Sequence, residues 1–408
     1  MHLPVMMVTI MVINIPLNDV AKYSGERISL KGINTASYVT TDNLLPNKKG
    51  KIAAAKLPQK GGTVTKFDIG DILISNIRPY LMKIWFADIC GGCSADVLTL
   101  KVKNNYDPSF IYYALHRDDF FLHMMNGSKG TKMPRGDKNQ ILEFPIPAFE
   151  IKKQKQIAKV LSDLDTKIKL NNKINQQLES MAKTIYDYWF VQFDFPDQNG
   201  KPYKSSGGMM VFDEKLKREV PEGWQCVELS YIANITMGQS PPGDSYNDDC
   251  IGDIFFQGCT DFGWRFPKIR KYTTKATRFA KKGDVLLSVR APVGTLNIAD
   301  NDCCIGRGLA ALNSKQGFDS YLFYVMVYFK QIFDHRNNSG TTFGSITKDD
   351  LFSLKLVLPA KKLLEKYDNQ VSKYNEIILN NHKQNQQLIK LRDWLLPMLM
   401  NGQVTVGK

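Results

Sequence analysis

The chain contains several short motifs whose residue types could support chemistry. The letters PD at 196–197, followed by DEK at 213–215, have the order of a nuclease that holds Mg²⁺ on carboxylates. The letters SPPG at 240–243 approach the motif with which amino-methyltransferases bind a flipped base. The first motif lies in a stretch rich in Pro, Gly and Ser, and the second has Gly243 where an aromatic residue would stack on the base. We therefore expect neither motif to be catalytic.

Motifs for a cofactor or a metal are equally incomplete. The letters GRG at 306–308 with Ala311 fit a dinucleotide-binding pattern, but no strand–helix–strand unit surrounds them. The letters CGGC at 90–93 form half a zinc knuckle, and the adjacent Cys303 and Cys304 cannot supply the other half. The five histidines are scattered and form no recurring Ser/His/Asp arrangement. The sequence predicts a chain that is not itself an enzyme and binds no metal or cofactor.

Segment 264–282 is the strongest candidate for contact with nucleic acid. It carries eight Lys and Arg residues, no acidic residue and four interleaved aromatic rings. Arg suits bidentate contact with guanine or phosphate, and Lys supplies positive charge for phosphate. An exposed hairpin whose charges merely keep it in solution would have the same composition. The candidates in this segment are Trp264, Arg265, Lys268, Arg270 and Lys271.

Polar and basic residues elsewhere supply the remaining candidates. A lysine-rich run without acids begins at residue 48, and Gly-rich loops at 127–138 and 338–348 lie at matching places in the chain. An Arg also follows each of two matched strands. Turn chemistry would equally explain the glycines, and either Arg could form a structural ion pair instead. These candidates are Tyr38, Thr40, Thr41, Lys48, Lys49, Lys51, Arg78, Lys129, Lys132, Arg135, Arg290, Thr341, Thr342 and Lys348.

The chain repeats itself with a spacing near 212 residues. GDILISNIRP at 70–79 matches GDVLLSVRAP at 283–292, and IPLNDVA at 15–21 matches VELSYIA at 227–233. A period of this length indicates two copies of a whole module, since solenoid repeats are far shorter. Each copy has short runs rich in Ile, Val, Phe and Tyr, broken by Gly, Pro and Asn turns, and then one long polar stretch. The predicted fold class is therefore α+β.

The long polar stretch of each copy is predicted to be a single long helix. Its apolar residues recur at alternating steps of four and three, which is the pattern of a coiled coil. Asn171 and Asn175 interrupt the first pattern, and Asn381 and Asn385 interrupt the second at equivalent places. An antiparallel pair would bring Asn171 to Asn385 and Asn175 to Asn381, where Asn fixes register at a cost in stability. The alternative is that these Asn side chains are solvated on loosely packed helices.

These patterns divide the chain into five predicted parts. Module 1 is residues 1–148, and module 2 is residues 219–358, both with mixed strands and helices. The long helices are 149–192 and 359–408, which we expect to form an antiparallel coiled-coil spacer. Residues 193–218 are rich in Pro, Gly, Ser and Lys and are predicted to be a linker.

Composition narrows the functional class. With 408 residues and 43% apolar content, the chain can bury real cores, which excludes wholly disordered proteins. Its 54 Lys and Arg against 40 Asp and Glu give a net charge of +14, which favours a polyanionic partner. Seven cysteines without a small-domain disulfide pattern suit the reducing cytoplasm. The apolar start at 3–15 is predicted to be a buried strand, because it is too short to span a membrane and lacks a cationic flank.

The sequence resembles the specificity (S) subunit of type I restriction-modification systems over nearly its whole length. The matching strings are PIPAFEIKKQKQIAKVLSDLDTKIKLNNKINQQLESM at 145–181, GDILISNIRPYL at 70–81 and GDVLLSVRAPVG at 283–294. The resemblance implies that each module is a target recognition domain for one half of a bipartite site in double-stranded DNA. It implies that the helices set the gap between the halves.

The resemblance also implies partners. Two modification (M) subunits would bind the chain and methylate adenine with S-adenosylmethionine, and restriction (R) subunits, where present, would use ATP and Mg. The alternative, from another class, is a coiled-coil scaffold whose two modules bind protein partners. A gene for an adenine methyltransferase beside this one would discriminate the two.

Overall fold

The computed structural model describes residues 12–59, 62–338 and 345–406, without the side chains of 335–338. It divides into two compact units: unit 1 holds the chain up to Leu170 and from Gln384 onward, and unit 2 holds Asn171–Lys383. The division falls inside both long helices, so each unit contains one module and part of each helix. Most of the apolar start lies outside the described residues, and the first strand begins at Asn14.

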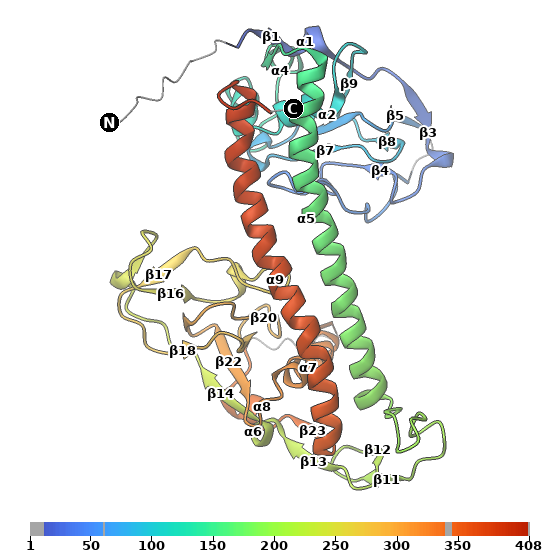
Figure 1. Cartoon of the computed structure of the whole chain (residues 1–408), viewed down its shortest axis with the longest axis vertical. Helices are drawn as coiled ribbons and strands as arrows, with labels where there is room; N and C mark the ends of the chain where they lie inside the picture. The colour runs from blue at the N-terminus through green and yellow to red at the C-terminus, as the bar shows by residue number, and fades with distance from the viewer. Residues whose placement is uncertain (1–11, 60–61, 339–344, 407–408) are drawn as a thin grey trace. The chain divides into compact units, whose positions relative to one another are not determined.

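Unit 1 is built around a sheet with strand order β2-β9-β6-β7, all antiparallel. Two of its strands, β7 and β9, are labelled in Figure 1. A second sheet has the order β3-β5-β8-β4, in which β4 and β8 are parallel, and β1 pairs with β10. The strands are β1 (Asn14–Pro16), β2 (Ala21–Tyr23), β3 (Arg27–Ser29), β4 (Tyr38–Val39), β5 (Thr63–Phe67), β6 (Ile72–Ser75), β7 (Ile84–Phe86), β8 (Gly91–Cys93), β9 (Val97–Val102) and β10 (Pro145–Pro147).

The helices of module 1 cover the core of that unit. They are α1 (Leu17–Val20), α2 (Pro108–Leu115), α3 (Asp118–Asn126) and α4 (Lys138–Leu142). The carboxylate of Asp107 caps α2 by accepting a hydrogen bond from the Phe110 amide at 2.9 Å. Strand β6 is buried along its whole length, as expected for the apolar run after the Gly-Asp turn.

Unit 2 repeats this plan with additions. The sheet β14-β22-β19-β20 corresponds to β2-β9-β6-β7, and the pair β13-β23 corresponds to β1-β10. The second sheet has the order β15-β17-β16-β21-β18, and β11 pairs with β12. The strands are β11 (Met210–Asp213), β12 (Arg218–Pro221), β13 (Gln225–Glu228), β14 (Ala233–Met237), β15 (Tyr246–Asn247), β16 (Asp253–Phe256), β17 (Lys271–Thr273), β18 (Phe279–Ala280), β19 (Val285–Ser288), β20 (Leu296–Ile298), β21 (Cys303–Ile305), β22 (Leu309–Ser314) and β23 (Lys355–Leu358). The helices of module 2 are α6 (Leu229–Ile232), α7 (Asp319–Asn338) and α8 (Lys348–Phe352).

The duplication predicted from the sequence extends to individual hydrogen bonds. Gly70 and Gly283 start matching turns with φ of +89° and +98°, a conformation that favours glycine. The following Asp71 and Asp284 each accept a bond on the side chain from the amide three residues earlier, at 2.8 and 2.9 Å. The amides of Leu17 and Leu229 bond at 2.9 and 2.7 Å to carbonyls just before β10 and β23. The two modules therefore share one backbone design.

The long helices form where the sequence predicts them. Helix α5 spans Ile151–Tyr186 and passes into a π-helical turn at Asp187–Val191, so the predicted continuous helix changes its hydrogen-bond pattern near its end. Helix α9 spans Lys361–Met400. Both lie along the module cores, as the green and red helices of Figure 1 show within each unit.

The two helices pair in opposite directions within unit 2. The Asn381 Nδ2 donates to Asn175 Oδ1 at 2.8 Å, and the Tyr367 hydroxyl donates to the carbonyl of Ala182 at 3.2 Å. Residue numbers rise along α5 as they fall along α9, so the two helices are antiparallel in this unit. The predicted contact of Asn175 with Asn381 is confirmed. The other predicted contact, Asn171 with Asn385, joins residues of different units and stays a prediction.

Residues 193–218 connect the modules as a folded segment rather than as a flexible tether. Strand β11 lies in it and pairs with β12, and Phe195 stacks on Tyr203 and Trp224 with ring centroids 4.7 and 5.0 Å away. Phe193 is buried in the same aromatic cluster. The composition that predicts a linker also contains these aromatic residues, and burying them orders the segment.

An aromatic core joins module 2 to both long helices. Tyr367 of α9 is fully buried, and its ring lies 5.1 Å from Phe190 and 6.2 Å from Tyr186 at the end of α5. Tyr321 of α7 packs on Phe190 at 4.9 Å. Since apolar burial is the main stabilising term in folding, this core holds the helices against the module in unit 2.

Replacing Tyr367 with Ala should lower the free energy of unfolding by about 3–5 kcal/mol, the usual cost of removing a buried aromatic ring. Tyr188→Ala is the matched control, because that ring is 45% exposed and its loss should cost within about 0.5 kcal/mol. Urea unfolding followed by circular dichroism checks both values. Equal midpoints for the two variants would contradict the assigned role of this core.

Candidate nucleic-acid interface

Arg78 and Arg290 occupy matching turns at the ends of β6 and β19. In each turn the hydroxyl of the last strand residue, Ser75 or Ser288, donates to a carbonyl two residues on, at 2.9 and 2.8 Å. Both arginines are exposed, and neither guanidinium has a hydrogen-bond or ion-pair partner within the described parts of the chain. The fold therefore presents an exposed arginine at the same place in each module.

The Gly-rich loop of module 1 lies beside Arg78. The Arg78 amide donates to the Pro134 carbonyl at 2.8 Å, and Lys129 and Arg135 exchange backbone hydrogen bonds at 3.0 Å. Lys129, Lys132 and Arg135 are all exposed, and Lys129 and Arg135 pair with Asp137 and Asp96 at 3.7 and 2.6 Å. Turn 76–78 and loop 127–138 thus form one exposed basic edge.

In module 2 the equivalent loop also reaches the matched turn. Arg290 forms an isolated bridge with Ser345, and the Ile346 amide donates to the Val289 carbonyl at 2.9 Å. Lys348 is exposed at the first turn of α8, with its ammonium 5.1 Å from the Phe352 ring. The candidates Thr341 and Thr342 lie outside the described residues.

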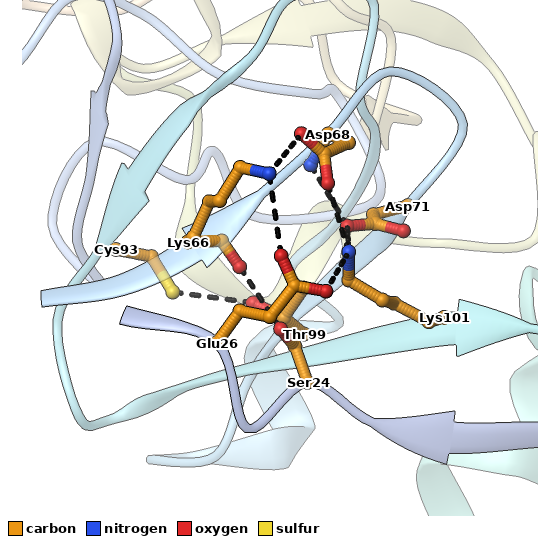
Figure 2. Close-up of polar contacts among 8 residues, drawn as sticks. All are labelled: Ser24, Glu26, Lys66, Asp68, Asp71, Cys93, Thr99 and Lys101. Atoms are coloured by element: carbon orange, nitrogen blue, oxygen red, sulfur yellow. Dashed lines mark hydrogen bonds and ion pairs between the residues drawn. The ribbon is translucent and has the colours of Figure 1, made fainter. Parts of the chain in front are cut away.

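An ion network anchors the Gly-Asp turn of module 1 (Figure 2). Lys101 lies between Glu26, Asp68 and Asp71, with nitrogen–oxygen distances of 3.0, 2.8 and 3.9 Å. Lys66 pairs with Glu26 and Asp68 at 3.2 and 3.1 Å. Burial raises the pKa of Asp71, and the nearby lysine opposes that rise. The two lysines are thus engaged by the three carboxylates of the module itself, so the network is structural.

Module 2 supports the same turn with a neutral residue. Asn313, at the position of Lys101, donates to Asp284 Oδ1 at 3.1 Å. Burial likewise raises the pKa of Asp284. The turn is thus kept in both modules by different partners.

Three candidates of module 1 turn out to be structural. Tyr38 is 5% exposed and packs in a small core, so its ring cannot reach DNA. Lys48 donates to the His116 carbonyl at 2.9 Å and pairs with Asp118. Lys51 donates to the Ala36 carbonyl at 2.7 Å, and burial lowers its pKa. The predictions for these residues are therefore corrected, because the chain itself satisfies their charge or buries their surface.

The neighbouring candidates keep exposed surface. Lys49 is exposed, and Thr40 and Thr41 are partly exposed. The Thr40 amide donates to Asn43 Oδ1 at 2.6 Å, which closes the turn after β4. Thr41 offers its carbonyl to Lys83. These residues remain candidates that the structure leaves accessible.

Arg265 is the clearest correction in module 2. Its side chain is fully buried and donates to Glu179 Oε1 of α5 at 3.1 Å and to Asn375 Oδ1 of α9 at 2.7 Å. Its guanidinium also lies over the Phe323 ring at 4.4 Å. Burial raises the pKa of Glu179, and Arg265 opposes that rise. This arginine joins the module to both long helices instead of contacting DNA.

The rest of segment 264–271 stays at the surface. Trp264, Lys268 and Lys271 are exposed, and no ion pair of either lysine occurs among the residues described. Arg270 is exposed but pairs with Asp261. One segment thus combines a buried structural arginine with free surface cations, which composition alone could not separate.

The sequence-based candidates omit one polar cluster, in which Gln257 and Arg307 are exposed. Ser240, Gln257 and the 306–308 turn meet through hydrogen bonds from Gln257 Nε2 to Ser240 Oγ at 2.8 Å and from the Arg307 amide to the same oxygen at 3.3 Å. The motifs SPPG and GRG, which resemble catalytic signatures separately, are therefore one site. The duplication is the signal that points to it, because Gln257 occupies the place of candidate Thr40.

The aspartates of the nuclease-like motif have a structural role. Asp197 accepts amides of Asn199 and Lys201 at 2.8 Å, and Asp213 accepts amides of Lys215 and Leu216 at 2.9 and 2.8 Å. Both carboxylates therefore cap turns. Within the described ranges no group of three or more His, Cys, Asp or Glu residues is placed to hold a metal ion. In that same part of the chain, no helix is both long and apolar enough to cross a bilayer.

Arg265→Met should lower the free energy of unfolding by about 3 kcal/mol, the low end for breaking a buried ion pair, since Glu179 keeps a third of its surface in water. Arg278→Met is the matched control and should change stability by less than about 0.5 kcal/mol, because Arg278 is exposed. Thermal unfolding of both variants measures the difference. If Arg265→Met kept full stability and instead altered DNA binding, the structural assignment would be wrong.

The family model for the type I restriction modification DNA specificity domain matches residues 14–180 and 221–389. A protein of Methanocaldococcus jannaschii, provisionally named the specificity subunit of type I restriction enzyme MjaX, is 33% identical over 350 residues, covering 83% of this chain and 79% of its own. The MjaIX specificity subunit of the same organism is 26% identical over 323 residues, which are 74% of this chain and 71% of that protein.

A solved structure shares the fold. The crystal structure of a type I restriction-modification system S subunit from M. genitalium matches with a TM-score of 0.62 at 16% identity, over 98% of both chains. The two matches to the family model coincide with the two modules and their long helices. This chain therefore belongs to the type I restriction-modification DNA specificity family, with two copies of the specificity domain.

Proposed function

We propose that this chain is the DNA sequence-specificity subunit of a type I restriction-modification enzyme, in which each module reads one half of a bipartite site. The single observation that carries this proposal is the duplicated module with an exposed arginine at the same turn, Arg78 and Arg290. Two copies of one scaffold with different side chains are suited to two unlike half-sites. Exposed cations supply the contacts to phosphates that position such a protein on DNA.

The long helices are proposed to set the gap between the halves as an antiparallel coiled-coil spacer. Helix α5 has 36 residues and α9 has 40, which corresponds to about 54 and 60 Å at 1.5 Å per residue. One turn of DNA is about 34 Å, so helices of this length can separate two reading sites by more than one turn. The Asn175–Asn381 pair supports a defined register, since Asn among apolar positions disfavours shifted pairings.

The proposed assembly assigns chemistry to partner subunits. Two M subunits dock on the helices and methylate adenine with S-adenosylmethionine, and R subunits, where the host has them, supply ATP- and Mg-dependent cleavage. The chain itself is proposed to be non-catalytic, to bind no cofactor and to act in the cytoplasm on double-stranded DNA. Exposed apolar residues on both helices support docking: Leu170 and Met181 on α5, and Ile377, Ile389 and Trp394 on α9.

Co-expression with the M subunit encoded beside this gene should methylate adenine in a motif of two short halves separated by a fixed gap. Mapping methylated adenines across the genome of a host that lacks the system measures this outcome. The M subunit alone is the control and should give no new methylation. An uninterrupted motif, or no methylation from an intact pair of subunits, would contradict the proposal.

Arg78→Ala and Arg290→Ala form a matched pair, because the two arginines occupy the same turn of different modules. Each should weaken binding of the assembled complex by about 1–3 kcal/mol if the arginine contacts a base, and should relax one position in its own half only. If it contacts phosphate, all sequences should weaken alike and the slope of log affinity against log salt should fall by about one. Competition binding at several salt concentrations separates these cases, and no change in either variant would exclude these turns from the interface.

A further inference from the structure

Two loops of module 2 meet at the ends of the parallel strands β16 and β21. Phe256 pairs with Ile305, so the residues that follow both strands emerge at the same edge of the sheet. The Gly306 amide donates to the Phe256 carbonyl at 2.8 Å, and the Gly308 amide donates to the Gln257 carbonyl at 3.3 Å. Gln257 is thereby held against the turn that carries Arg307.

Glycines permit this close approach. A Cβ on Gly306 would lie 3.0 Å from Gln257 Cα and from Gln257 Oε1, and a Cβ on Gly308 would lie 2.8 Å from the Gln257 carbonyl oxygen. A Cβ on Gly238 would lie 2.2 Å from the Gly306 oxygen. None of the three has a left-handed φ. Glycine is therefore required at these positions because a side chain would not fit, not because of the backbone conformation.

The amide of Gln257 is exposed and oriented. Its Nε2 donates to Ser240 Oγ at 2.8 Å, and Tyr246 holds the Ser240 loop by donating its hydroxyl to the Pro241 carbonyl at 2.9 Å. The Tyr246 ring in turn stacks on Phe255 at 4.7 Å. The Gln257 Oε1 lies 3.3 Å from Ser240 Oγ and 3.5 Å from the Tyr246 hydroxyl, but both hydroxyls make a shorter bond elsewhere, to Gln257 Nε2 and to the Pro241 carbonyl. A ligand can therefore replace these two long contacts at Oε1 and accept the second N–H of the amide. That donor–acceptor pair matches the N7 and N6 edge of adenine in the major groove.

Arg307 stands beside this amide as an uncommitted cation. It is exposed, and in the described part of the chain its guanidinium has neither an ion pair nor a hydrogen bond. The Val289 amide donates to the Gly308 carbonyl at 3.0 Å, and the Ile305 amide donates to the Arg278 carbonyl at 2.9 Å. The site therefore adjoins exposed Arg290 and Arg278. A free guanidinium matches the O6 and N7 edge of guanine.

The same place in module 1 carries different chemistry. The Ser94 amide donates to the Val39 carbonyl at 2.9 Å, which matches the bond between Gly306 and Phe256. This match makes Thr40 the counterpart of Gln257 and Asp96 the counterpart of Gly308. Asp96 also forms an ion pair with Arg135 at 2.6 Å. Equal backbones with unlike side chains are what two different half-sites require.

We propose that Gln257 and Arg307 are the base-reading residues of module 2, with Gln257 recognising an adenine and Arg307 an adjacent guanine in the major groove. The inference rests on the proposed function. Ser240, Gly306 and Gly308 position the amide of Gln257 rather than contact the bases. The reading site is thus built from the two loops whose glycines allow them to touch.

The test uses the assembled complex with M subunits and maps methylated adenines for the wild type, Gln257→Leu and Arg307→Ala. Each variant should relax one position in the half-site of module 2 and leave the other half and the gap unchanged. Discrimination at that position should fall about tenfold to a hundredfold, as for the loss of one bidentate base contact. Lys282→Ala is the control, because it removes an exposed cation near the start of β19, at the far end of that strand from Arg290.

The Gly306→Ala variant is an independent test of the same site. Because it displaces Gln257 while retaining its amide, it should relax the position that Gln257→Leu relaxes. Size-exclusion chromatography with M subunits shows that each variant assembles, which is expected since Gln257 and Arg307 are exposed.

The outcomes separate the inference from the proposed function. An unchanged motif in assembled Gln257→Leu and Arg307→Ala complexes overturns the inference alone. An equal loss of methylation at all sequences, the effect that removal of any exposed cation such as Lys282 would have, also overturns it. A wild-type complex that methylates no two-part motif overturns the proposed function and the inference with it. Relaxation confined to the half-site of module 2 supports both.

Discussion

In each unit an ion pair with its hydrogen bonds joins the module to both long helices, next to the apolar core that packs the same elements together. In unit 2 the pair centres on Arg265, which binds Glu179 of α5 and Asn375 of α9. In unit 1 it centres on Asp165 of α5, which accepts from Arg392 of α9 and from Tyr113 of α2, each at 2.8 Å. The guanidinium of Arg265 is fully buried, so its contacts tolerate little rotation of module 2 against the helices. Arg392 and Asp165 keep 17% and 20% of their side-chain surface exposed, so the constraint in unit 1 is weaker. The two units use opposite charges for the same purpose.

Duplication with divergence explains how one backbone serves two roles. The Gly-Asp turns, the serine-closed turns and the parallel strand ends recur in both modules. The side chains around them differ: Lys101 against Asn313, Thr40 against Gln257, Asp96 against Gly308. Backbone hydrogen bonds do not depend on side-chain type, so the scaffold is preserved while the exposed positions are free to change. A reader of two unlike half-sites can arise from one module in this way.

Net charge is a poor guide to the interface of this protein. Lys48, Lys51, Lys66 and Lys101 are engaged within module 1, and Arg265 is buried in module 2. Other cations are exposed and have no ion pair among the described residues, including Arg78, Arg290 and Arg307 at loop ends and several lysines on α5. Only such groups gain by displacing counterions from DNA, because a cation already paired inside the protein has no charge left to offer.

The sequence by itself determined the duplication, the α+β modules, the two long helices and the Asn175–Asn381 register, because these are recorded in repeats and periods along the chain. It also determined the family. Only the tertiary structure decided that Tyr38, Lys48, Lys51 and Arg265 are structural, since burial and ion pairing depend on residues distant in sequence. It alone brought Ser240, Gln257 and Arg307 together across the ends of β16 and β21. The sequence gives the number of charged residues and the positions of motifs, but the tertiary structure determines which of these residues are exposed and which contact one another.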